Sequence, residues 1–493
     1  MNDFRALERV SGVYFSVLVS VFLLVVPVGG YEAIGVFKYR LFLGVCLSYC
    51  VIVVLFRLQL AIVGIEPIGG VGVWVRKMDL SAKLLLLMLL LIVVSAVLSR
   101  YGGVFVGAFR QEGMLTYSIY ILSCVFVAKY LNPKRWMLWF LGICVVLFCA
   151  ISFIQLAGAN PFVLFPRGHN FYSAGAYFPE RFIGTIGNVG LAGAFLSLVA
   201  GVFAMAVIKS PGFKECLLLA IPLFLVVWLI FALAVDAAIL AVSAGFLLML
   251  PIAIIGKQSL AKALFGISIA LAAIAAARLS PSPLMLSAIF AIFAAGVSKI
   301  DFFDKIPIKW YRAGSVGFVL IAIFASIVFV LRGSHDYGSM LYEASQILRG
   351  NWDDSFGSAR VYIWRNVVEQ MQFRNLLFGT GPDTLGHWPI APFGGFCEEQ
   401  GIWMLTHIDA AHNEYLHMLA TIGLLPLLCY LLVLAIAAIH WWREPQNTAA
   451  AIAGAGVLFY CIQAFFGISM PITAPFFWAC LAILISKERV ANK

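Results

Sequence analysis

The sequence predicts an all-α polytopic membrane protein with about fourteen transmembrane helices (12–14) and a large, partly helical outer loop. Hydrophobic residues make up 63% of the 493 residues and charged residues only 11%, against roughly 45–50% and 25% in soluble domains. Apolar runs long enough to cross a hydrocarbon core of ~30 Å as helices recur along nearly the whole chain. A soluble fold has too little interior to bury that much apolar surface.

The apolar runs place the expected membrane helices along the chain. We expect spans near residues 12–30, 41–64, 81–99, 113–131, 136–157, 187–208, 216–235, 237–256, 259–277, 282–298, 313–331, 412–440, 449–468 and 471–486. The first run lacks the small-residue cleavage site of a secretory signal peptide, and many further spans follow it. We therefore interpret it as the first membrane helix.

The distribution of Lys and Arg predicts the orientation, because these residues are retained on the cytoplasmic side. With the N-terminus inside, 21 of the 33 basic residues fall in inner segments. Five of the others flank or lie in one long outer loop, which translocates largely regardless of charge: Arg332, Arg349, Arg360, Arg365 and Arg374. Both termini are therefore expected in the cytoplasm. Anionic lipid at the inner surface accounts for the net charge of +10, so no nucleic-acid partner is predicted.

Motifs for metal and nucleotide binding do not occur. The sequence has no CxxC, CxxH or HExxH spacing and no GxxxxGK[ST] motif, so we predict no metal site, no cofactor and no nucleotide hydrolysis. Nine of the ten cysteines fall within or beside predicted spans, and only Cys397 lies in an outer loop. That distribution argues against a disulfide framework.

Two long segments interrupt the alternation of helix and short turn, and both are expected to face outward. Residues 158–186 are rich in Gly, Pro and aromatic residues, and residues 333–411 form a still longer segment. We divide the chain into a transmembrane bundle, 1–332, which includes the outer loop 158–186, a large outer loop bearing site residues, 333–411, and C-terminal transmembrane helices, 412–493. An outer loop of this length is uncommon unless it has a function.

The large outer loop carries helical patterns of its own. Four apolar residues recur at helical spacing: Val361, Trp364, Val368 and Met371. We expect Ser358 to cap the N-terminus of that helix. A further short helix is expected around residues 339–349, and the turn-rich stretch GTGPDTLGHWPIAPFGG then leads back to the membrane.

Histidines gather on the predicted outer side. Five of the seven map there: His169, His335, His387, His407 and His412. A histidine titrates near neutral pH, so it can accept a proton from an acceptor hydroxyl. His412 is the strongest candidate, because it lies in AHNEYLHMLATIGLL where the outer loop re-enters the membrane as a helix. Tyr415, one turn further, is expected to share its face.

The His412-Asn413 pair, followed after nine residues by Gly423, resembles the signature of the O-antigen ligase and polymerase family of bacterial membrane glycosyltransferases. The wider run AHNEYLHMLATIGLLPLLCYL is similar to that family throughout.

Two upstream segments extend the resemblance to about residues 180–480. The segment from Ser358-Ala359-Arg360 through Trp364, followed by LLFGTGPDTLG, resembles the family's outer loop before the histidine. Arg181 and the run GTIGNVGLAG, with Gly184, Thr185 and Asn188, resemble the family's Arg and Gly-Thr-Phe-Gly-Asn-Pro-Asn segment.

The resemblance implies a GT-C-like enzyme of the bacterial cytoplasmic (inner) membrane. Its donor would be a glycan on undecaprenyl diphosphate in the outer leaflet, and its acceptor a glycan, a lipid or a protein. We assign catalysis to His412, Arg360 and Arg181, because guanidinium groups bind diphosphate oxygens and stabilise the charge of a leaving group. Four other residues are assigned to substrate binding: Asn413, Tyr415, Asn188 and Asp236. A single in-line displacement would invert the configuration at the anomeric carbon and would need no metal.

The chain departs from the family pattern at several positions. Many members have Ser-Arg-Gly where this chain has AVDAAIL, so Asp236 replaces a basic residue. Either Arg181 or Arg278 compensates for that loss, or the geometry of the site differs. Val189-Gly190 replaces a Pro-Asn pair, and Pro426 stands where ligases often have Gly, Thr or Tyr. These departures weaken the choice among family members but not the resemblance itself.

Several activities remain open at this stage. We rank a ligase first, ahead of a repeat-unit polymerase and an O-linked protein oligosaccharyltransferase, which share the same donor chemistry. A flippase for the lipid-linked glycan is the alternative from another class. That function predicts ionisable residues along a path through the membrane and inverted repeats, whereas the mid-span charges here are few and polar residues gather in the outer loops.

Overall fold

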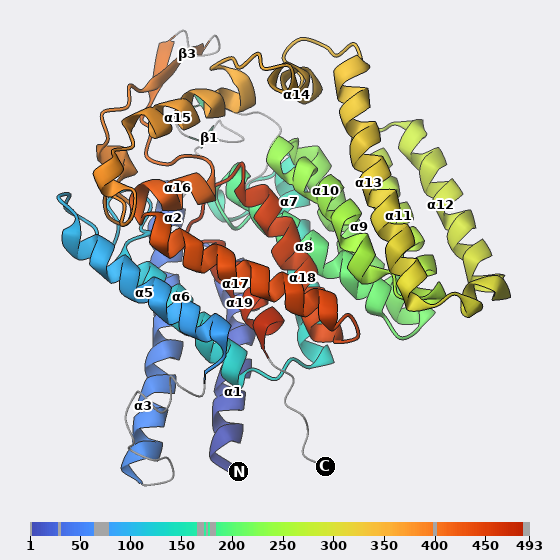
Figure 1. The fold of residues 1–493 in the computed structure, drawn as a ribbon, viewed down its shortest axis with the longest axis horizontal. Helices are drawn as coiled ribbons and strands as arrows, with labels where there is room; N and C mark the ends of the chain where they lie inside the picture. The colour runs from blue at the N-terminus through green and yellow to red at the C-terminus, as the bar shows by residue number, and fades with distance from the viewer. Residues whose placement is uncertain are drawn as a thin grey trace.

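The computed structural model describes residues 2–27, 31–63, 78–164, 172–173, 176–177, 184–397 and 402–486. Within them the chain is helical apart from two short antiparallel hairpins (Figure 1). The hairpins pair β1 (Tyr172–Ser173) with β2 (Ala176–Tyr177) and β3 (Phe393–Cys397) with β4 (Ile402–Thr406). The predicted helical, polytopic membrane class is confirmed.

The helices follow one another with short connections over most of the chain. The N-terminal helices are α1 (Asn2–Val17), α2 (Tyr31–Phe42), α3 (Ser48–Ile62), α5 (Leu80–Leu98), α6 (Met114–Tyr130) and α7 (Arg135–Leu156). The middle group comprises α8 (Val189–Lys209), α9 (Phe213–Leu233), α10 (Asp236–Ala253), α11 (Lys257–Arg278), α12 (Pro281–Lys299) and α13 (Ile308–Arg332). The C-terminal helices are α16 (Glu414–Thr421), α17 (Leu424–Arg443), α18 (Thr448–Ala464) and α19 (Ala474–Ile485). Two π-helical turns, η1 (Leu18–Phe22) and η2 (Leu43–Leu47), continue α1 and join α2 to α3.

Ten helices in the described part of the chain are long and apolar enough to cross a membrane. They are the continuous helix Ala33–Ile62, α5, each helix from α7 to α13, and α17. The predicted spans also include α6, α18 and α19, which are apolar but only 17, 17 and 12 residues long. The predicted span 12–30 lies on a helix that begins already at Asn2, where Asp, Arg and Glu residues lower the hydropathy.

The predicted span 412–440 is not a single helix. It is divided into α16 and α17 by a turn at Ile422 and Gly423, where Gly423 has a φ of +91°. Glycine adopts this left-handed backbone without a steric penalty. A Cβ atom there would lie 2.4 Å from the carbonyl oxygen of Leu377. Only α17 has the length of a membrane span, so α16 is a separate short helix ahead of it.

The centre of the bundle is α8, whose membrane-spanning window is buried over its whole length. It packs against α9, α10, α11 and α18. Small residues allow this close packing: a Cβ atom at Gly201 would lie only 2.4 Å from the carbonyl oxygen of Ala455 on α18. Small residues are common at such contacts in membranes, because close approach of helices maximises van der Waals packing.

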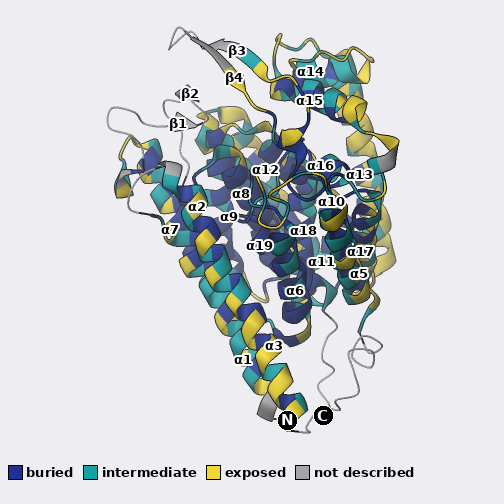
Figure 2. Cartoon of the chain, turned by 90° about the vertical axis from the view of Figure 1, so that its left-hand side faces the viewer, coloured by how far each residue is buried: buried dark blue, intermediate teal, exposed yellow. Residues whose placement is uncertain are grey.

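The segment 333–411, predicted to be the large outer loop, folds into a cap over one end of the bundle, opposite the N-terminal end of α1 (Figure 2). The cap contains α14 (Met340–Leu348), α15 (Phe356–Gln370) and the β3–β4 hairpin. Both helices expected in this segment are therefore present. The expected cap at Ser358 is wrong: Gly357, Ser358 and Ala359 have φ values of 63°, 57° and 65°, so regular helix starts after them. Ser358 makes no capping hydrogen bond there.

Gly201→Ala should destabilise the protein, because the added methyl group would force α8 away from α18. Overpacking of this kind typically costs about 1–3 kcal/mol. Thermal unfolding of the purified protein in detergent would measure the loss. Gly266→Ala on α11 is the matched control, since a Cβ atom there would meet only Val207 at an ordinary 3.8 Å. Equal melting temperatures for the Gly201→Ala variant and the wild type would contradict the predicted tight contact.

Candidate active site

His412 occupies the turn that leads from the cap into α16. Its backbone is left-handed, with a φ of 47°, a conformation that costs a non-glycine residue about 1–3 kcal/mol. Asn413 follows in extended conformation, and its Oδ1 accepts a hydrogen bond from the Leu416 N–H at 3.0 Å. Asn413 therefore caps α16. The His-Asn pair is the start of a helix, with the histidine just outside it.

The far end of α16 is held by backbone contacts to the cap. The Gly381 N–H donates to the carbonyl of Thr421, and the Leu424 N–H donates to the carbonyl of Leu376, each at 2.8 Å. A Cβ atom at Gly379 would lie 2.2 Å from the same Thr421 oxygen. In Figures 1 and 2, α16 lies between the cap and the bundle. The glycines of GTGPDTLG and the Gly423 turn thus place α16 between these two parts.

Arg110, in the connection between α5 and α6, reaches the site through two aspartates of the cap region. The N–H groups of Phe109 and Arg110 both donate to Oδ2 of Asp383, at 2.9 and 2.7 Å. The Arg110 guanidinium pairs with Asp409 and also contacts Sδ of Met470 at 3.8 Å. The backbone and the side chain of Arg110 are therefore both fixed.

Arg360, in the first turn of regular helix in α15, bridges the cap and the bundle. Its Nε donates to the carbonyl of Phe466 at 3.0 Å, and its Nη1 donates to the carbonyl of Gly357 at 2.5 Å. Burial lowers the pKa of Arg360, while Asp236 and Glu343 lie close enough to oppose that effect. An arginine keeps its proton in such surroundings, so a cation is held at the base of the cap.

His412 lies within electrostatic reach of both arginines. Burial, and then the charges of Arg110 and Arg360, lower the pKa of His412 to about 3, with Asp409 acting in the opposite direction. The imidazole is therefore neutral at physiological pH. A neutral imidazole retains a ring nitrogen that can accept a hydrogen bond or a proton.

A small buried cavity adjoins Arg110. Its lining comprises Arg110, Glu112, Tyr117, Ala410, Glu414, His417, Ile468 and Ser469. Oε2 of Glu414 accepts a hydrogen bond from the Tyr460 hydroxyl at 3.2 Å. Burial raises the pKa of Glu112 to about 8 and that of Glu414 to about 7, and lowers the pKa of His417 to about 4. Near neutral pH Glu112 and His417 are therefore largely uncharged and Glu414 is about half protonated, while Arg110 and Asp409 form an ion pair beside the cavity.

The other predicted substrate-binding residues have structural contacts. Oδ1 of Asn188 accepts a hydrogen bond from the Leu191 N–H at 3.0 Å and caps α8. The Tyr415 hydroxyl donates to the carbonyl of Cys461 at 2.9 Å and links α16 to α18. Arg181 lies outside the described residues. Of the predicted residues, the structure brings together His412, its neighbours Asn413 and Tyr415, Arg360 and Asp236.

Sequence reasoning missed Arg110, Asp409, Glu112 and Glu414. One signal was available: Arg110-Gln111-Glu112 is a short charged run directly before the apolar helix α6. Ionisable residues at the end of a membrane helix are functional candidates by default. Glu414 also lies inside the histidine motif, two residues after His412. The link between Arg110 and Asp409 carried no such signal, because 299 residues separate them.

A second pocket, of polar character, opens beside the C-terminal end of α5. It is lined by amide and cationic side chains together with two aromatic residues: Arg100, Tyr101, Gln370, Gln372, Asn375 and Trp388. The ring of Tyr101 stacks on His387 with 5.1 Å between centroids. Thr380, in the turn that contacts α16, also lines this pocket.

Comparison with known protein families identifies one match. Residues 244–431 match the family model described as O-antigen ligase, and no curated protein matches the chain. The match covers less than half of the chain. It includes Arg360, His412 and Gly423 and leaves Arg110 and Asp236 outside. Members of this family are generally ligases and polymerases of lipid-linked glycans. The chain is therefore a polytopic membrane protein that carries a domain of the O-antigen ligase family at residues 244–431.

Proposed function

We propose that the protein is an inverting, metal-independent glycosyltransferase that moves a glycan from undecaprenyl diphosphate to an acceptor hydroxyl. The reaction takes place on the outer face of the bacterial cytoplasmic membrane. The observation that carries this proposal is a neutral imidazole at His412 within electrostatic reach of Arg360 and Arg110. The reaction needs this combination: a proton acceptor beside cations that stabilise a departing diphosphate. The family match supports the lipid-linked donor.

The chemical step is a single displacement at the anomeric carbon. The acceptor hydroxyl hydrogen-bonds to the neutral imidazole of His412 and attacks from the face opposite the diphosphate. The new bond between the acceptor oxygen and the anomeric carbon forms as the bond to the diphosphate oxygen breaks. The diphosphate leaves with the bonding electron pair, and the acceptor proton passes to His412. The negative charge of a bound diphosphate raises the basicity of the imidazole when the donor is present.

Arg360 is the principal diphosphate ligand in this mechanism. Two of its nitrogens are engaged by the carbonyls of Phe466 and Gly357, which fixes the guanidinium plane. In the described part of the chain, Nη2 has no hydrogen-bond partner and is available to a phosphate oxygen. Arg110 also contributes positive charge near His412, but Asp409 occupies its Nε and Nη2. Arg181 remains a third candidate for the same role.

The acceptor defines which member of the family this is, and we place a ligase first. A repeat-unit polymerase is the alternative, and an O-linked protein oligosaccharyltransferase is a further one. The polar pocket beside α5 suits the sugar part of a substrate, because amides and a guanidinium can bind hydroxyl groups while Tyr101 supplies an apolar ring face. The loss of one glycoconjugate on deletion of the chain, identified by mass analysis, would distinguish these acceptors.

The orientation proposed from the basic residues has both termini in the cytoplasm and the cap outside. The position of the cap at the end opposite the start of α1 supports it (Figure 2). The alternative function, a flippase for the lipid-linked glycan, can be tested by reconstituting the protein with that glycan. Transfer to an added acceptor supports the enzyme, whereas movement between leaflets without a new bond would support the flippase.

Replacing either principal site residue should abolish most of the transfer. We expect Arg360→Ala to lower kcat by about 10²–10³, the usual effect of losing one charge-stabilising donor. His412→Ala should lower kcat by about 10²–10⁴, the typical contribution of a general base. Arg365→Ala is the control, because this arginine of the same helix is half exposed and pairs with Asp354 at the surface. Wild-type transfer by well-folded His412→Ala protein would refute the assignment.

The rate should fall as the pH rises through about 7–8. Over that range Glu414 and Glu112 lose their protons, and new carboxylates beside Arg110 would oppose the binding of a diphosphate. His412 stays neutral above its pKa of about 3. Lowering the pH to mildly acidic values should therefore not reduce the rate. The profile of kcat/KM against pH would show both effects.

The double variant Glu112→Gln/Glu414→Gln tests whether these two carboxyl groups cause the fall in rate at high pH. Glutamine keeps the shape of the side chain but cannot lose a proton, so the decline at high pH should disappear. Glu215→Gln, which changes a carboxylate at the other end of the bundle, should retain it. If the double variant shows the wild-type decline, another group is responsible.

Changes in the polar pocket should affect substrate binding rather than chemistry. We expect Gln372→Ala to raise KM for the glycan acceptor several-fold while leaving kcat nearly unchanged, because one hydrogen bond typically contributes about 0.5–1.5 kcal/mol. Steady-state kinetics with varied acceptor at saturating donor would measure the change. Glu369→Ala, at the adjacent exposed surface of α15, is the control. A fall in kcat at unchanged KM would exclude the pocket as an acceptor subsite.

A further inference from the structure

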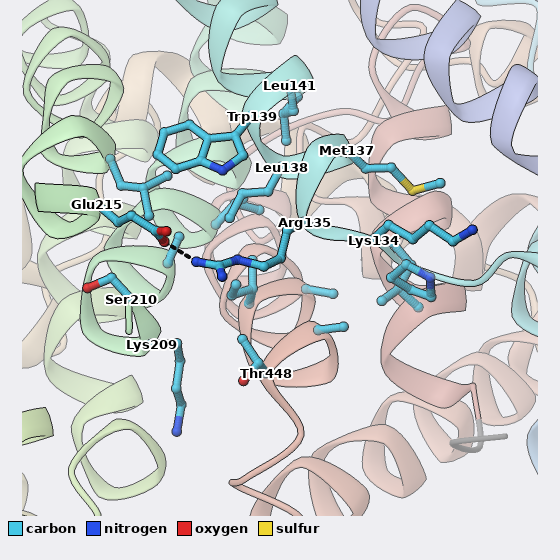
Figure 3. Close-up of a pocket in the computed structure, with 18 of the residues that line it drawn as sticks. Lys134, Arg135, Met137, Leu138, Trp139, Leu141, Lys209, Ser210, Glu215 and Thr448 are labelled. Atoms are coloured by element: carbon cyan, nitrogen blue, oxygen red, sulfur yellow. Dashed lines mark hydrogen bonds and ion pairs between the residues drawn. The ribbon is translucent and has the colours of Figure 1, made fainter. Parts of the chain in front are cut away.

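A cleft with apolar walls (Figure 3) lies where α7 and α18 begin and α8 ends. The candidate active site lies at the other end of α18, where Arg360 donates to the carbonyl of Phe466. The volume of the cleft is about 240 Å³. Its walls come from six helices, α1, α7, α8, α9, α18 and α19, with apolar side chains that include Trp139, Ala206, Ile452 and Ile483. Pockets that enclose a drug-sized ligand measure roughly 300–1,000 Å³. This cleft is therefore large enough for part of an acyl chain but not for an entire lipid.

Cations outnumber carboxylates around the cleft. Lys134, Arg135 and Lys209 line it together with one acidic residue, Glu215. Figure 3 shows Arg135 paired with Glu215 across the cleft. Lys134 lies 3.3 Å from Glu8. The residues that line the cleft therefore carry a net positive charge, because Glu215 is the one carboxylate among them.

Lys209, at the end of α8, is the cation least neutralised by the protein. Its Nζ donates to the carbonyl of Pro445 at 2.7 Å, and no carboxylate of the described residues pairs with it. Arg312 lies close enough to repel it, and the nearby Lys262 donates to the carbonyl of Ser210. Arg312 itself donates to the carbonyl of Trp442 at 2.8 Å. Three cations therefore gather where carbonyl oxygens and, for Arg312, the ring of Trp442 receive them, and no carboxylate of the described residues pairs with them.

This combination indicates an amphipathic anion as the occupant. Apolar walls between membrane helices suit an acyl chain, and unbalanced cations at the end of those helices suit a phosphodiester. A soluble phosphate compound would leave the apolar walls without a partner. A zwitterionic lipid would add a positive group beside cations that already repel one another. The charge and the shape of the cleft therefore both favour an anionic phospholipid.

We propose that this cleft binds one anionic phospholipid of the cytoplasmic leaflet, with its phosphate at Lys209 and Arg135 and one acyl chain along the apolar walls. The bound lipid contacts α7, α8 and α18 at once, so it stabilises the inner end of the bundle beneath α8. This site is separate from glycan transfer and does not depend on the proposed chemistry.

The test is lipid selectivity of the purified full-length chain. Native mass spectrometry would be performed after equilibration with mixed micelles containing equal amounts of phosphatidylglycerol and phosphatidylcholine. We expect one retained phosphatidylglycerol per chain. Lys209→Gln should weaken that retention by about five-fold, the effect of about 1 kcal/mol per basic residue near a lipid phosphate. Lys214→Gln, an exposed lysine in the first turn of α9 that does not line the cleft, should behave as wild type.

A second variant separates the cleft from the general basic surface. Ala449→Trp keeps every cation but fills the cleft from α18, where Ala449 is one of the lining residues, and it should also abolish retention. Unchanged retention in Ala449→Trp protein, or equal retention of the two lipids by the wild type, would overturn the proposal. Thermal unfolding of each variant provides a second measurement, because a bound lipid should raise the melting temperature of the wild type and not that of Ala449→Trp.

Discussion

The backbone contact between the Gly379–Gly381 turn and the α16–α17 turn holds the cap against the bundle, and the candidate site depends on it. The Gly381 N–H donates to the carbonyl of Thr421 at 2.8 Å, and the Leu424 N–H donates at the same distance to the carbonyl of Leu376, just before the glycine turn. The Ser99 hydroxyl at the end of α5 donates to the carbonyl of Thr380 at 2.6 Å. Side chains at Gly379 and Gly423 would collide with the opposing backbone. The same turn presents Asp383 to the amides of residues 109 and 110. One contact thus positions α16, His412 and Arg110 together.

Burial determines the charge state of the groups gathered by this contact. In a region that excludes water, an isolated carboxylate or imidazolium loses its hydration, so neutral forms are favoured. His412, His417, Glu112 and Glu414 all shift toward neutrality for this reason. Burial also lowers the pKa of Arg360, but a guanidinium retains its proton even in such surroundings. The site therefore combines neutral acceptors with permanent cations, the arrangement that a leaving diphosphate requires.

The parts of the fold that depend on local pattern were predictable. Apolar runs located the membrane helices, and helical spacing located α14 and α15, because both signals lie within a few residues of sequence. Ser358 was assigned wrongly, since three consecutive left-handed residues delay the start of regular helix. The Gly423 turn inside span 412–440 was missed because a glycine within an apolar run carries no periodic signal. Arg110 was missed because its partners Asp383 and Asp409 lie more than 270 residues away.

Asp236 shows how the structure changes the interpretation of a departure from the family pattern. From the sequence, Asp236 replaces a basic residue of the family pattern and is predicted to bind substrate, with Arg181 or Arg278 compensating for the lost cation or the geometry of the site differing. In the structure Asp236 lies close enough to Arg360 to stabilise the charged guanidinium, and it stands in the first turn of α10, where the helix dipole favours a negative charge. A partly buried cation needs such a counter-charge while the donor is absent. In the proposed mechanism, a diphosphate at Arg360 would supply the same charge more strongly. Asp236 would then be the group that stabilises the charged Arg360 while no donor is bound.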